Sequence, residues 1–170
     1  VLYSGGKLNG HTEITKGVLT VYGNNDISNL TLNDSLVNMP HGNGYTNLQI
    51  DELNGTGVFN LSSNLAENVS DHLNIKSGSG NFGLIIHDYS TEGNLPPQIK
   101  IIDENSAAAD NFYLVGNAVD VGAFQYDLRQ EGNDWVLSRT PELTDSSLIA
   151  KNTYNSLSSL FYTCLLYTSP

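Results

Sequence analysis

Apolar residues alternate with polar ones in short bursts from Thr12 to Ser138. Each burst is a pair of apolar residues separated by one residue, in a run of four to seven residues bounded by Gly, Asn, Asp or Ser. The pairs are Leu19/Val21, Leu30/Leu32, Leu48/Ile50, Phe59/Leu61, Leu73/Ile75, Leu84/Ile86, Ile99/Ile101 and Phe112/Leu114. This spacing places each pair on one face of a β-strand, and the boundary residues favour turns. The pattern predicts an all-β chain over this range.

Two of these bursts repeat along the chain. Segment 47–50 (NLQI) returns at 72–75 (HLNI), and segment 55–61 (GTGVFNL) returns at 78–84 (GSGNFGL). A period of about 20–30 residues is the length of one solenoid coil. In such a coil we expect the glycines to turn a corner and Phe and Leu to point inward, stacked on their counterparts at about 4.8 Å. Asn side chains at the corners can hydrogen-bond along the stack.

A β-sandwich is the alternative at this point, because its strands also recur every 8–12 residues or so with turns between them. The spacings between successive apolar pairs alternate between short and long along the chain. The step from Leu19 to Leu30, for example, is short, and the next step, to Leu48, is long. This alternation favours a coil with unequal corners over a sandwich.

From Val119 onward the short bursts give way to longer alternating segments. Residues 119–128 (VDVGAFQYDL) are predicted to form one longer strand and residues 134–138 (DWVLS) another, and the turn at 131–134 makes the pair a β-hairpin. The last coil of a solenoid exposes an unpaired edge, so a terminal cap is expected. The hairpin carries the single tryptophan, Trp135, and suits that role.

The segment after the hairpin differs again. Pro141 is expected to interrupt the strand, and Thr144 or Asp145 can cap a helix that begins at about Ser146. The last seven residues, 164–170 (CLLYTSP), have no place in the periodic scheme and resemble translated sequencing-adapter read-through. They contain the single cysteine, so no internal disulfide is expected.

Composition restricts the possible functions. The 170 residues hold 18 Asp and Glu against 7 Lys and Arg, a net charge of −11, so nucleic acid is not an expected partner. No apolar run approaches the roughly 20 residues of a membrane-spanning helix. The chain begins at Val1 with neither an initiator Met nor a signal peptide, so we expect it to be an internal fragment of a larger protein.

Five motifs between residues 45 and 139 are specific in combination. They are Gly57-x-Phe59-x-Leu61, Ser70-Asp71-x-Leu73-x-Ile75, Gly78-x-Gly80-x-Phe82, Val119-Asp120-x-Gly122-Ala123-Phe124-x-Tyr126-x-Leu128 and Trp135-x-Leu137-x-Arg139. Together they resemble the C-terminal end of pertactin-like autotransporter passengers. Val136 departs from the family pattern, which often has Tyr at this position.

The resemblance implies a right-handed parallel β-helix (a solenoid) at the surface of a Gram-negative bacterium, ending in a capping hairpin and a short linker helix. It divides the chain into β-helix coils (1–44), a folding core with its cap (45–139), a linker helix or the start of the translocator (140–163), and the discounted tail (164–170). The implied partner is the family's own C-terminal outer-membrane β-barrel. Host surface molecules are a further expected partner, and no cofactor is expected.

The function implied is physical: the folding core templates the folding of earlier coils during secretion and displays upstream regions at the cell surface. We expect eight residues to carry the folding core, namely Leu73, Phe82, Asp120, Gly122, Phe124, Tyr126, Leu128 and Trp135.

Catalysis finds little support in the sequence. The four histidines fall on different coils without a metal-ligand spacing, and the adjacent acids 51/52 and 103/104 would point to opposite faces of a strand. We therefore expect a chain that is not an enzyme. Two alternatives stay open: an adhesive β-helix that binds its ligand through turns such as 38–43, and a polysaccharide-degrading β-helix enzyme, which would need charged residues clustered on one strand face.

Overall fold

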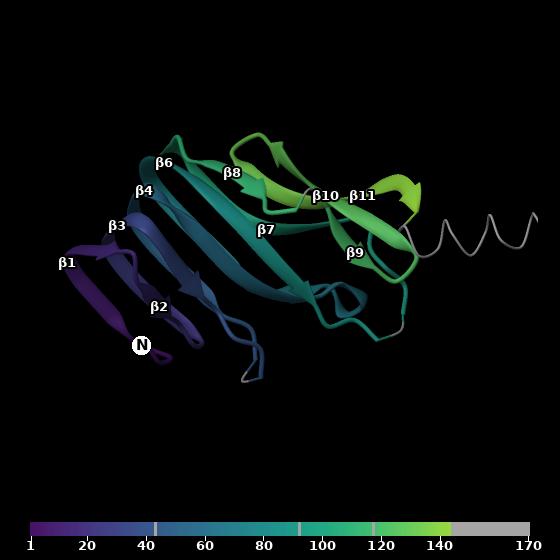
Figure 1. Cartoon of the computed structure of the whole chain (residues 1–170), viewed down its shortest axis with the longest axis horizontal. Coiled ribbons are helices and arrows are strands. Elements are labelled where there is room, and N and C mark those ends of the chain that lie inside the picture. The colour runs from purple at the N-terminus through teal and green to yellow at the C-terminus, as the bar shows by residue number, and fades with distance from the viewer. Residues whose placement is uncertain (43, 92, 117, 144–170) are drawn as a thin grey trace, which may run out of the picture.

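The strands of the chain wind into one continuous coil. The computed structural model describes residues 1–42, 44–91, 93–116 and 118–143. Its strands form an 11-stranded sheet, whose main path runs β1-β3-β4-β6-β7-β11-β10-β9 and whose strands lie side by side along the long axis (Figure 1). The elements are β1 (Lys7–Thr15), β2 (Val18–Thr20), β3 (Asn24–Asn38), β4 (Asn47–Asn64), the 3-10 helix η1 (Leu65–Glu67), β5 (Val69–Ser70), β6 (His72–Asp88), β7 (Gln98–Ala108), β8 (Asn111–Leu114), β9 (Val119–Val121), β10 (Phe124–Glu131) and β11 (Asp134–Leu143).

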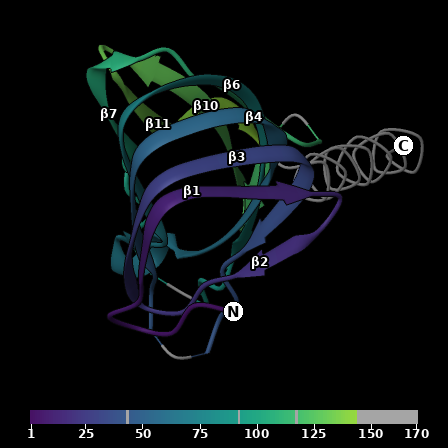
Figure 2. The ribbon, with the colours of Figure 1, turned by 90° about the vertical axis from the view of Figure 1, so that its left-hand side faces the viewer.

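Parallel pairing stacks equivalent residues of successive coils. Ile27 of β3 lies beside Ile50 of β4, which lies beside Ile75 of β6, and all three are buried. Seen from the β1 end, β1, β3, β4 and β6 form nested curved ribbons around a common interior (Figure 2). Burial of these apolar stacks is what holds the coils together, because each coil can cover its inward face only against its neighbours. The predicted all-β parallel β-helix is therefore confirmed.

One of the two sequence repeats does not correspond to the structural register. The alignment of segment 47–50 with 72–75 is confirmed, and the same register continues along the whole β4–β6 ladder. Gly55 therefore pairs with Gly80, and Phe59 pairs with Leu84 and not with Phe82, so the alignment of segment 55–61 with 78–84 is wrong. The two alignments differ by two positions, which is the side-chain period of a strand. Both keep Phe and Leu facing inward, so the sequence pattern alone could not separate them.

The corners of the coil are bends inside long strands and not breaks between short ones. β3, β4 and β6 have 15, 18 and 17 residues, where runs of four to seven were predicted. At the bend of β4 the buried residues Ile50 and Leu53 are three positions apart, which resets the alternation. Gly55 and Gly78 adopt positive φ angles of 99° and 135°, as expected for glycines that turn corners.

Asparagine side chains hydrogen-bond between coils, as predicted. Bonds of this kind between described asparagines of adjacent coils have donor–acceptor distances of 2.7–2.8 Å. The pairs are Asn60 to Asn38, Asn74 to Asn47 and Asn111 to Asn81. These bonds run along the stack, so they add to the backbone ladder in holding one coil on the next.

An antiparallel cap closes the C-terminal end of the coil, as the hairpin pattern predicted. β11 pairs with β7 of the last coil, β10 pairs with β11, and β9 pairs with β10, all antiparallel. The single strand predicted for 119–128 is wrong, because a two-residue turn with Gly122 at a φ of 58° separates β9 from β10.

The strand of the cap also continues past Pro141, which was predicted to interrupt it. Pro141 lies where the β10–β11 register shifts, between the Tyr126–Arg139 and Phe124–Leu143 pairs. At such a bulge no ladder N–H is required, so proline is tolerated. The helix expected from about Ser146 lies outside the described residues. Across the described part of the chain, no helix has the length and apolarity to span a membrane.

Candidate functional site

Four aromatic rings form a column that runs from the coil into the cap. We call Phe59, Phe82, Phe112 and Trp135 the aromatic column; they come from β4, β6, β8 and β11. Successive ring centroids are 5.6, 5.7 and 5.6 Å apart, and both end pairs meet edge to face. Such contacts stabilise by about 0.5–1.5 kcal/mol each beyond the burial of area. The column therefore joins the cap to the coils beneath it through direct side-chain contact.

Trp135 is the member of the column that belongs to the cap. Its side chain is 7% exposed, and its indole Nε1 donates a hydrogen bond of 3.1 Å to Oε2 of Glu104 on β7. In the β11–β7 ladder, Trp135 pairs with Ile102. Trp135 is thus tied to the last coil by ring contact, by its N–H group and by strand pairing.

Tyr126 anchors the other strand of the cap. Its side chain is fully buried, and its hydroxyl donates a 2.6 Å hydrogen bond to the carbonyl oxygen of Pro96 in the loop before β7. Burial raises the pKa of Tyr126 above its ordinary value, so the phenol stays protonated and can donate. Nearby, the Arg139 guanidinium lies 4.8 Å from the ring centroid of Phe124, a cation–π contact.

The eight residues expected to carry the folding core fall into two groups. Six lie in or against the interior: Leu73, Phe82, Tyr126 and Trp135 are buried, and Phe124 and Leu128 are partly buried against the core. Asp120 and Gly122 instead lie on the exposed side of the β9–β10 hairpin. Asp120 accepts a 3.0 Å hydrogen bond from the Gln125 side chain, so this contact is local to that hairpin.

Two buried carboxyl groups near Trp135 were not among the expected site residues. Glu104 and Asp110 are 7% and 4% exposed, and Oε1 of Glu104 and both Asp110 oxygens have no hydrogen-bond partner among the described residues. Asp110 comes two residues before Phe112, so strand alternation places it on the inward face. Alternation from the Ile99/Ile101 pair would place Glu104 on the outer face. Glu104 turns inward because the alternation shifts by one residue between Ile101 and Ile102, which are both fully buried.

Burial changes the proton affinity of both groups. Burial, reinforced by the negative charge of Glu104, raises the pKa of Asp110 to about 7. Burial also raises the pKa of Glu104, although the hydrogen bond from Trp135 opposes this. The adjacent Asp103 contacts His72 Nε2 at 2.7 Å and Lys100 Nζ at 2.6 Å, so the two acids lie on opposite faces of the strand, as predicted.

A third buried carboxylate, Asp71, clamps three segments together. Its Oδ1 accepts a 2.7 Å hydrogen bond from the backbone N–H of Thr46, and its Oδ2 accepts a 2.6 Å bond from that of Ser62. Burial raises the pKa of Asp71 to about 6, although these two N–H groups oppose the shift. The clamp joins the segment before β4, the end of β4 and the start of β6.

We expect Asp110→Asn to make the folded chain more stable at pH 8 and to flatten its pH dependence. The folded-state pKa of Asp110 lies above the ordinary value, so its contribution to stability is full below about pH 4 and is lost as the pH rises through about 7. Through Asp110 alone, the free energy of unfolding should fall between pH 5 and 8 by on the order of 2 kcal/mol. Urea titrations at several pH values measure this.

The matched control is Asp120→Asn, which makes the same side-chain change at an exposed position of the neighbouring hairpin. A profile for Asp110→Asn that parallels that of the unmodified chain would contradict the assignment of the buried proton to Asp110.

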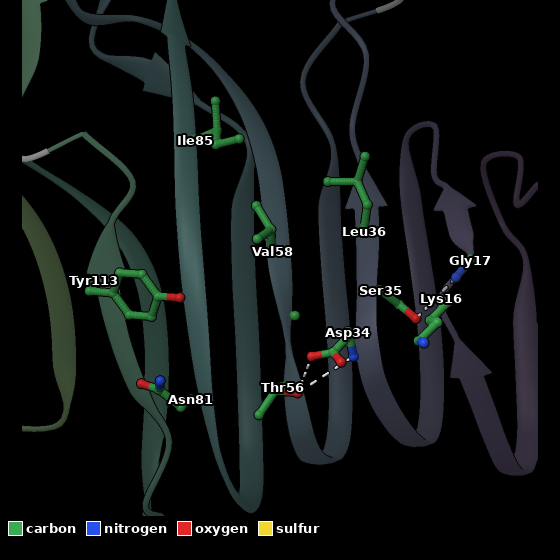
Figure 3. A pocket seen from close by; sticks show the side chains of 11 residues that line it. Lys16, Gly17, Asp34, Ser35, Leu36, Thr56, Val58, Asn81, Ile85 and Tyr113 are labelled. Carbon is green, nitrogen blue, oxygen red and sulfur yellow. Dashed lines mark hydrogen bonds between the residues drawn. The ribbon is translucent and has the colours of Figure 1, made fainter.

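A groove crosses the outside of the coil at one corner. We call it the lateral groove; its volume is about 570 Å³, and its lining includes Lys16, Asp34, Thr56, Val58, Asn81 and Tyr113 (Figure 3). These residues come from consecutive coils, between the β1–β2 connection and β8. Over the described ranges, no cluster of three or more His, Cys, Asp or Glu residues could hold a metal ion.

Comparisons with known proteins agree with this architecture. A sequence profile of the pertactin family matches residues 27–139. The IgA1 protease autotransporter of Haemophilus influenzae is 32% identical over 116 residues (63% of this chain), and the autotransporter adhesin/invasin TibA of Escherichia coli O78:H11 is 33% identical over 94 residues (53% of this chain). The crystal structure of the Haemophilus influenzae Hap adhesin has a similar fold, with a TM-score of 0.67, 19% identity and 79% of this chain covered.

The capped parallel coil and these relatives define the passenger region of an autotransporter. Because the profile matches more than half of its residues, the chain belongs to the pertactin family. The expected location, the cell surface and outer membrane of a Gram-negative bacterium, is confirmed by the autotransporter relatives.

The chain spans only a small part of these relatives. It covers 7% of the IgA1 protease autotransporter, 9% of TibA and 17% of the Hap chain. The similarity therefore concerns the β-helix and its cap, and the activities of the whole proteins lie outside this comparison.

Proposed function

We propose that this chain is the folding nucleus and stalk of an autotransporter passenger. In this proposal residues 45–139 fold first and residues 1–44 add to them as further coils. The chain contributes no catalysis, the segment 140–163 links it to the family's outer-membrane β-barrel, and upstream regions are displayed at the cell surface.

The aromatic column is the observation that carries the proposal. A coil in a solenoid gains most of its stability from the interface with its neighbour, so the first coil to fold needs a surface that is already formed. The antiparallel hairpin β10–β11 can supply that surface, because its strands are joined by a two-residue turn and need no distant partner. Trp135 then meets Phe112, and Phe112 meets Phe82 and Phe59, so each coil finds an aromatic ring in place.

Burial on the growing end also gives the process a direction. Each added coil buries residues such as Ile75, Ile50 and Ile27 in turn, and this burial opposes return of the chain through a pore. The low content of charged residues, 15%, suits the passage of an unfolded chain.

The kinetics of refolding test this order. We expect Phe82→Leu, in the core, to slow folding of the chain roughly tenfold, because most of its destabilisation is already present in the transition state. We expect Leu30→Ala, in an upstream coil, to change the folding rate less than about twofold and to accelerate unfolding instead. Stopped-flow measurements in urea give both rates. A lower folding rate for Leu30→Ala, together with an unchanged folding rate for Phe82→Leu, would reverse the proposed order of folding and overturn the proposal.

Adhesion is the second candidate function, and the lateral groove is the observation that favours it. In the turn expected to bind a ligand, His41 stacks on Tyr89 with ring centroids 3.9 Å apart. A polysaccharide-degrading enzyme receives no such support. It would need clustered acids or bases on one strand face, and the charged residues that line the lateral groove are one lysine, Lys16, and one aspartate, Asp34.

A further inference from the structure

Leu36, Val58 and Tyr113 line the lateral groove and belong to an outward-facing row of residues drawn from successive coils. In register, Val18 lies beside Leu36, Leu36 beside Val58, Val58 beside Gly83 and Gly83 beside Tyr113. Outward positions of a solenoid are ordinarily polar. Here Tyr113 is 44% exposed, and Val18, at the end of the row and outside the groove lining, is 63% exposed. Contiguous apolar residues on the outer face of a sheet are typical of a surface that contacts another molecule.

Gly83 sets the position of the aromatic ring in this row. A Cβ atom at Gly83 would lie 3.3 Å from the ring atoms of Tyr113 and 2.8 Å from the Val115 side chain. The ring therefore packs across the glycine, and its hydroxyl end is directed along the groove toward Val58 (Figure 3). Tyr113 has no partner for its hydroxyl among the residues that the structure describes.

A polar rim runs beside the apolar row. Thr56 donates a 3.2 Å hydrogen bond to Asp34 Oδ1, and Asn81 accepts a 2.7 Å bond from Asn111, so these side chains are held in place along the corner. The second carboxylate oxygen of Asp34 and the amide N–H₂ of Asn81 remain available on the exposed side. Lys16 completes the rim at its N-terminal end.

We propose that the lateral groove binds a neutral oligosaccharide laid along the axis of the coil. The apolar row with Tyr113 contacts the C–H faces of the sugar rings, and the rim of carboxylate, amide, hydroxyl and ammonium groups hydrogen-bonds the sugar hydroxyls. This inference goes beyond the folding role, and its failure would leave that role intact.

The charges of the groove favour a ligand without net charge. Lys16 and Asp34 are the charged residues of the lining, and their formal charges cancel. The chain as a whole carries −11, which disfavours polyanions such as sulfated glycans. With neither a basic nor an acidic excess at the site, hydroxyl groups are the ligand chemistry that the rim can satisfy.

The pairing of the strands disfavours a peptide added as a further strand. β-Strand addition requires a sheet edge with free N–H and C=O groups. Beneath the groove, β3 lies between β2 and β4, and β4 lies between β3 and β6, so both strands are paired on each side. Recognition must therefore use side chains on the face of the sheet.

The length of the groove indicates an oligosaccharide and not a single sugar. Its lining residues span five consecutive coil positions, from Lys16 to Tyr113. With strands about 4.8 Å apart, this corresponds to about 19 Å along the axis. Each step along the coil is close to the length of one sugar ring, so successive coils can contact successive rings.

An array of neutral and anionic glycans, with affinities then measured by titration calorimetry, tests the proposal on the full chain. We expect binding to one or more neutral oligosaccharides, weakened at least about tenfold by Tyr113→Ala or Asn81→Ala. Tyr89→Ala is the matched control, because Tyr89 is also 44% exposed but lies outside the groove, and it should leave the affinity unchanged. Thermal unfolding verifies that every variant is folded.

Three outcomes would overturn the proposal. One is the absence of binding to every neutral glycan on the array. A second is a preference for anionic glycans that Lys16→Gln abolishes. The third is that substitutions in the groove change self-association in the ultracentrifuge, or the capture of a protein, while Tyr113→Ala leaves glycan binding unchanged.

Discussion

Replacement of Trp135 by alanine is expected to destabilise the chain by about 3–5 kcal/mol, which is the typical cost of truncating a large buried aromatic side chain. The indole is 7% exposed, and its loss removes the edge contact with Phe112 and opens a cavity between the cap and the last coil. The hydrogen bond from Nε1 to Glu104 is lost as well, so a carboxyl group that is already partly unsatisfied loses this partner too. Urea unfolding followed by far-UV circular dichroism measures the change.

Two further variants separate the causes of this effect. Trp135→Phe keeps a ring beside Phe112 and removes the N–H donor, so we expect it to cost less than the alanine variant. Gln130→Ala is the control, because Gln130 is exposed and pairs directly with Trp135 in the β10–β11 ladder. We expect it to change the free energy of unfolding by less than about 0.5 kcal/mol. An alanine variant at Trp135 with the stability of the Gln130 control would show that the ring does not hold the cap.

A single methyl group at Gly78 is expected to cost about 3 kcal/mol or more, since it combines backbone strain with a steric clash. Gly78 turns a corner of β6 at a φ of 135°, and a Cβ atom there would lie 1.9 Å from the carbonyl oxygen of Leu53 on the neighbouring coil. Because backbone must move to relieve such a contact, Gly78→Ala should disturb the β4–β6 ladder as well as strain the corner. Thermal unfolding gives the loss of stability.

Gly42 provides a matched comparison. Its φ of 136° is nearly that of Gly78, but a Cβ atom at Gly42 would have no heavy atom within 4 Å. Gly42→Ala therefore reports the backbone strain alone, about 1 kcal/mol. Equal losses for the two variants would mean that the close approach of neighbouring coils has no energetic role.

Period-two alternation and turn residues predicted the coil because they reflect forces that act locally. Inward Ile and Phe residues, glycine corners and asparagine stacks all follow from strand geometry and turn chemistry. The β4–β6 register is different, because it depends on which residues of two separate coils meet. A slip of two residues keeps the same side chains facing inward. The sequence therefore allowed Phe59 to be aligned with Phe82, whereas in the structure Phe59 pairs with Leu84.

The cap shows a second limit of sequence reasoning. An alternating pattern over 119–128 looks like one strand, and only the turn at Gly122 divides it. Pro141 looks like a strand end, but it lies in a bulge where its missing N–H has no consequence. In the first case a turn was missed, and in the second a break was predicted that does not occur. Both depend on how the neighbouring strands pair, which the local sequence does not reveal.

The candidate site was predictable in its apolar part and not in its charged part. Trp135, Phe82 and Tyr126 could be chosen from size and position. Asp110 occupies an inward position relative to Phe112, but a carboxyl group at an inward position is ordinarily excluded because of its desolvation cost. Glu104 could not be placed from the pattern, because alternation from Ile99 and Ile101 puts it on the outer face. Only the one-residue shift between the buried residues Ile101 and Ile102 turns it inward.

The uniform register of the β4–β6 ladder has an evolutionary consequence. Each paired residue of β4 has its counterpart one constant period later in β6, so a duplication or deletion of that whole period would leave the hydrogen-bond ladder and the cap undisturbed. Each duplication would lengthen the rod by about 4.8 Å, the spacing of two strands. The length of the rod can therefore change by fixed increments through recombination within the gene, without redesign of the cap.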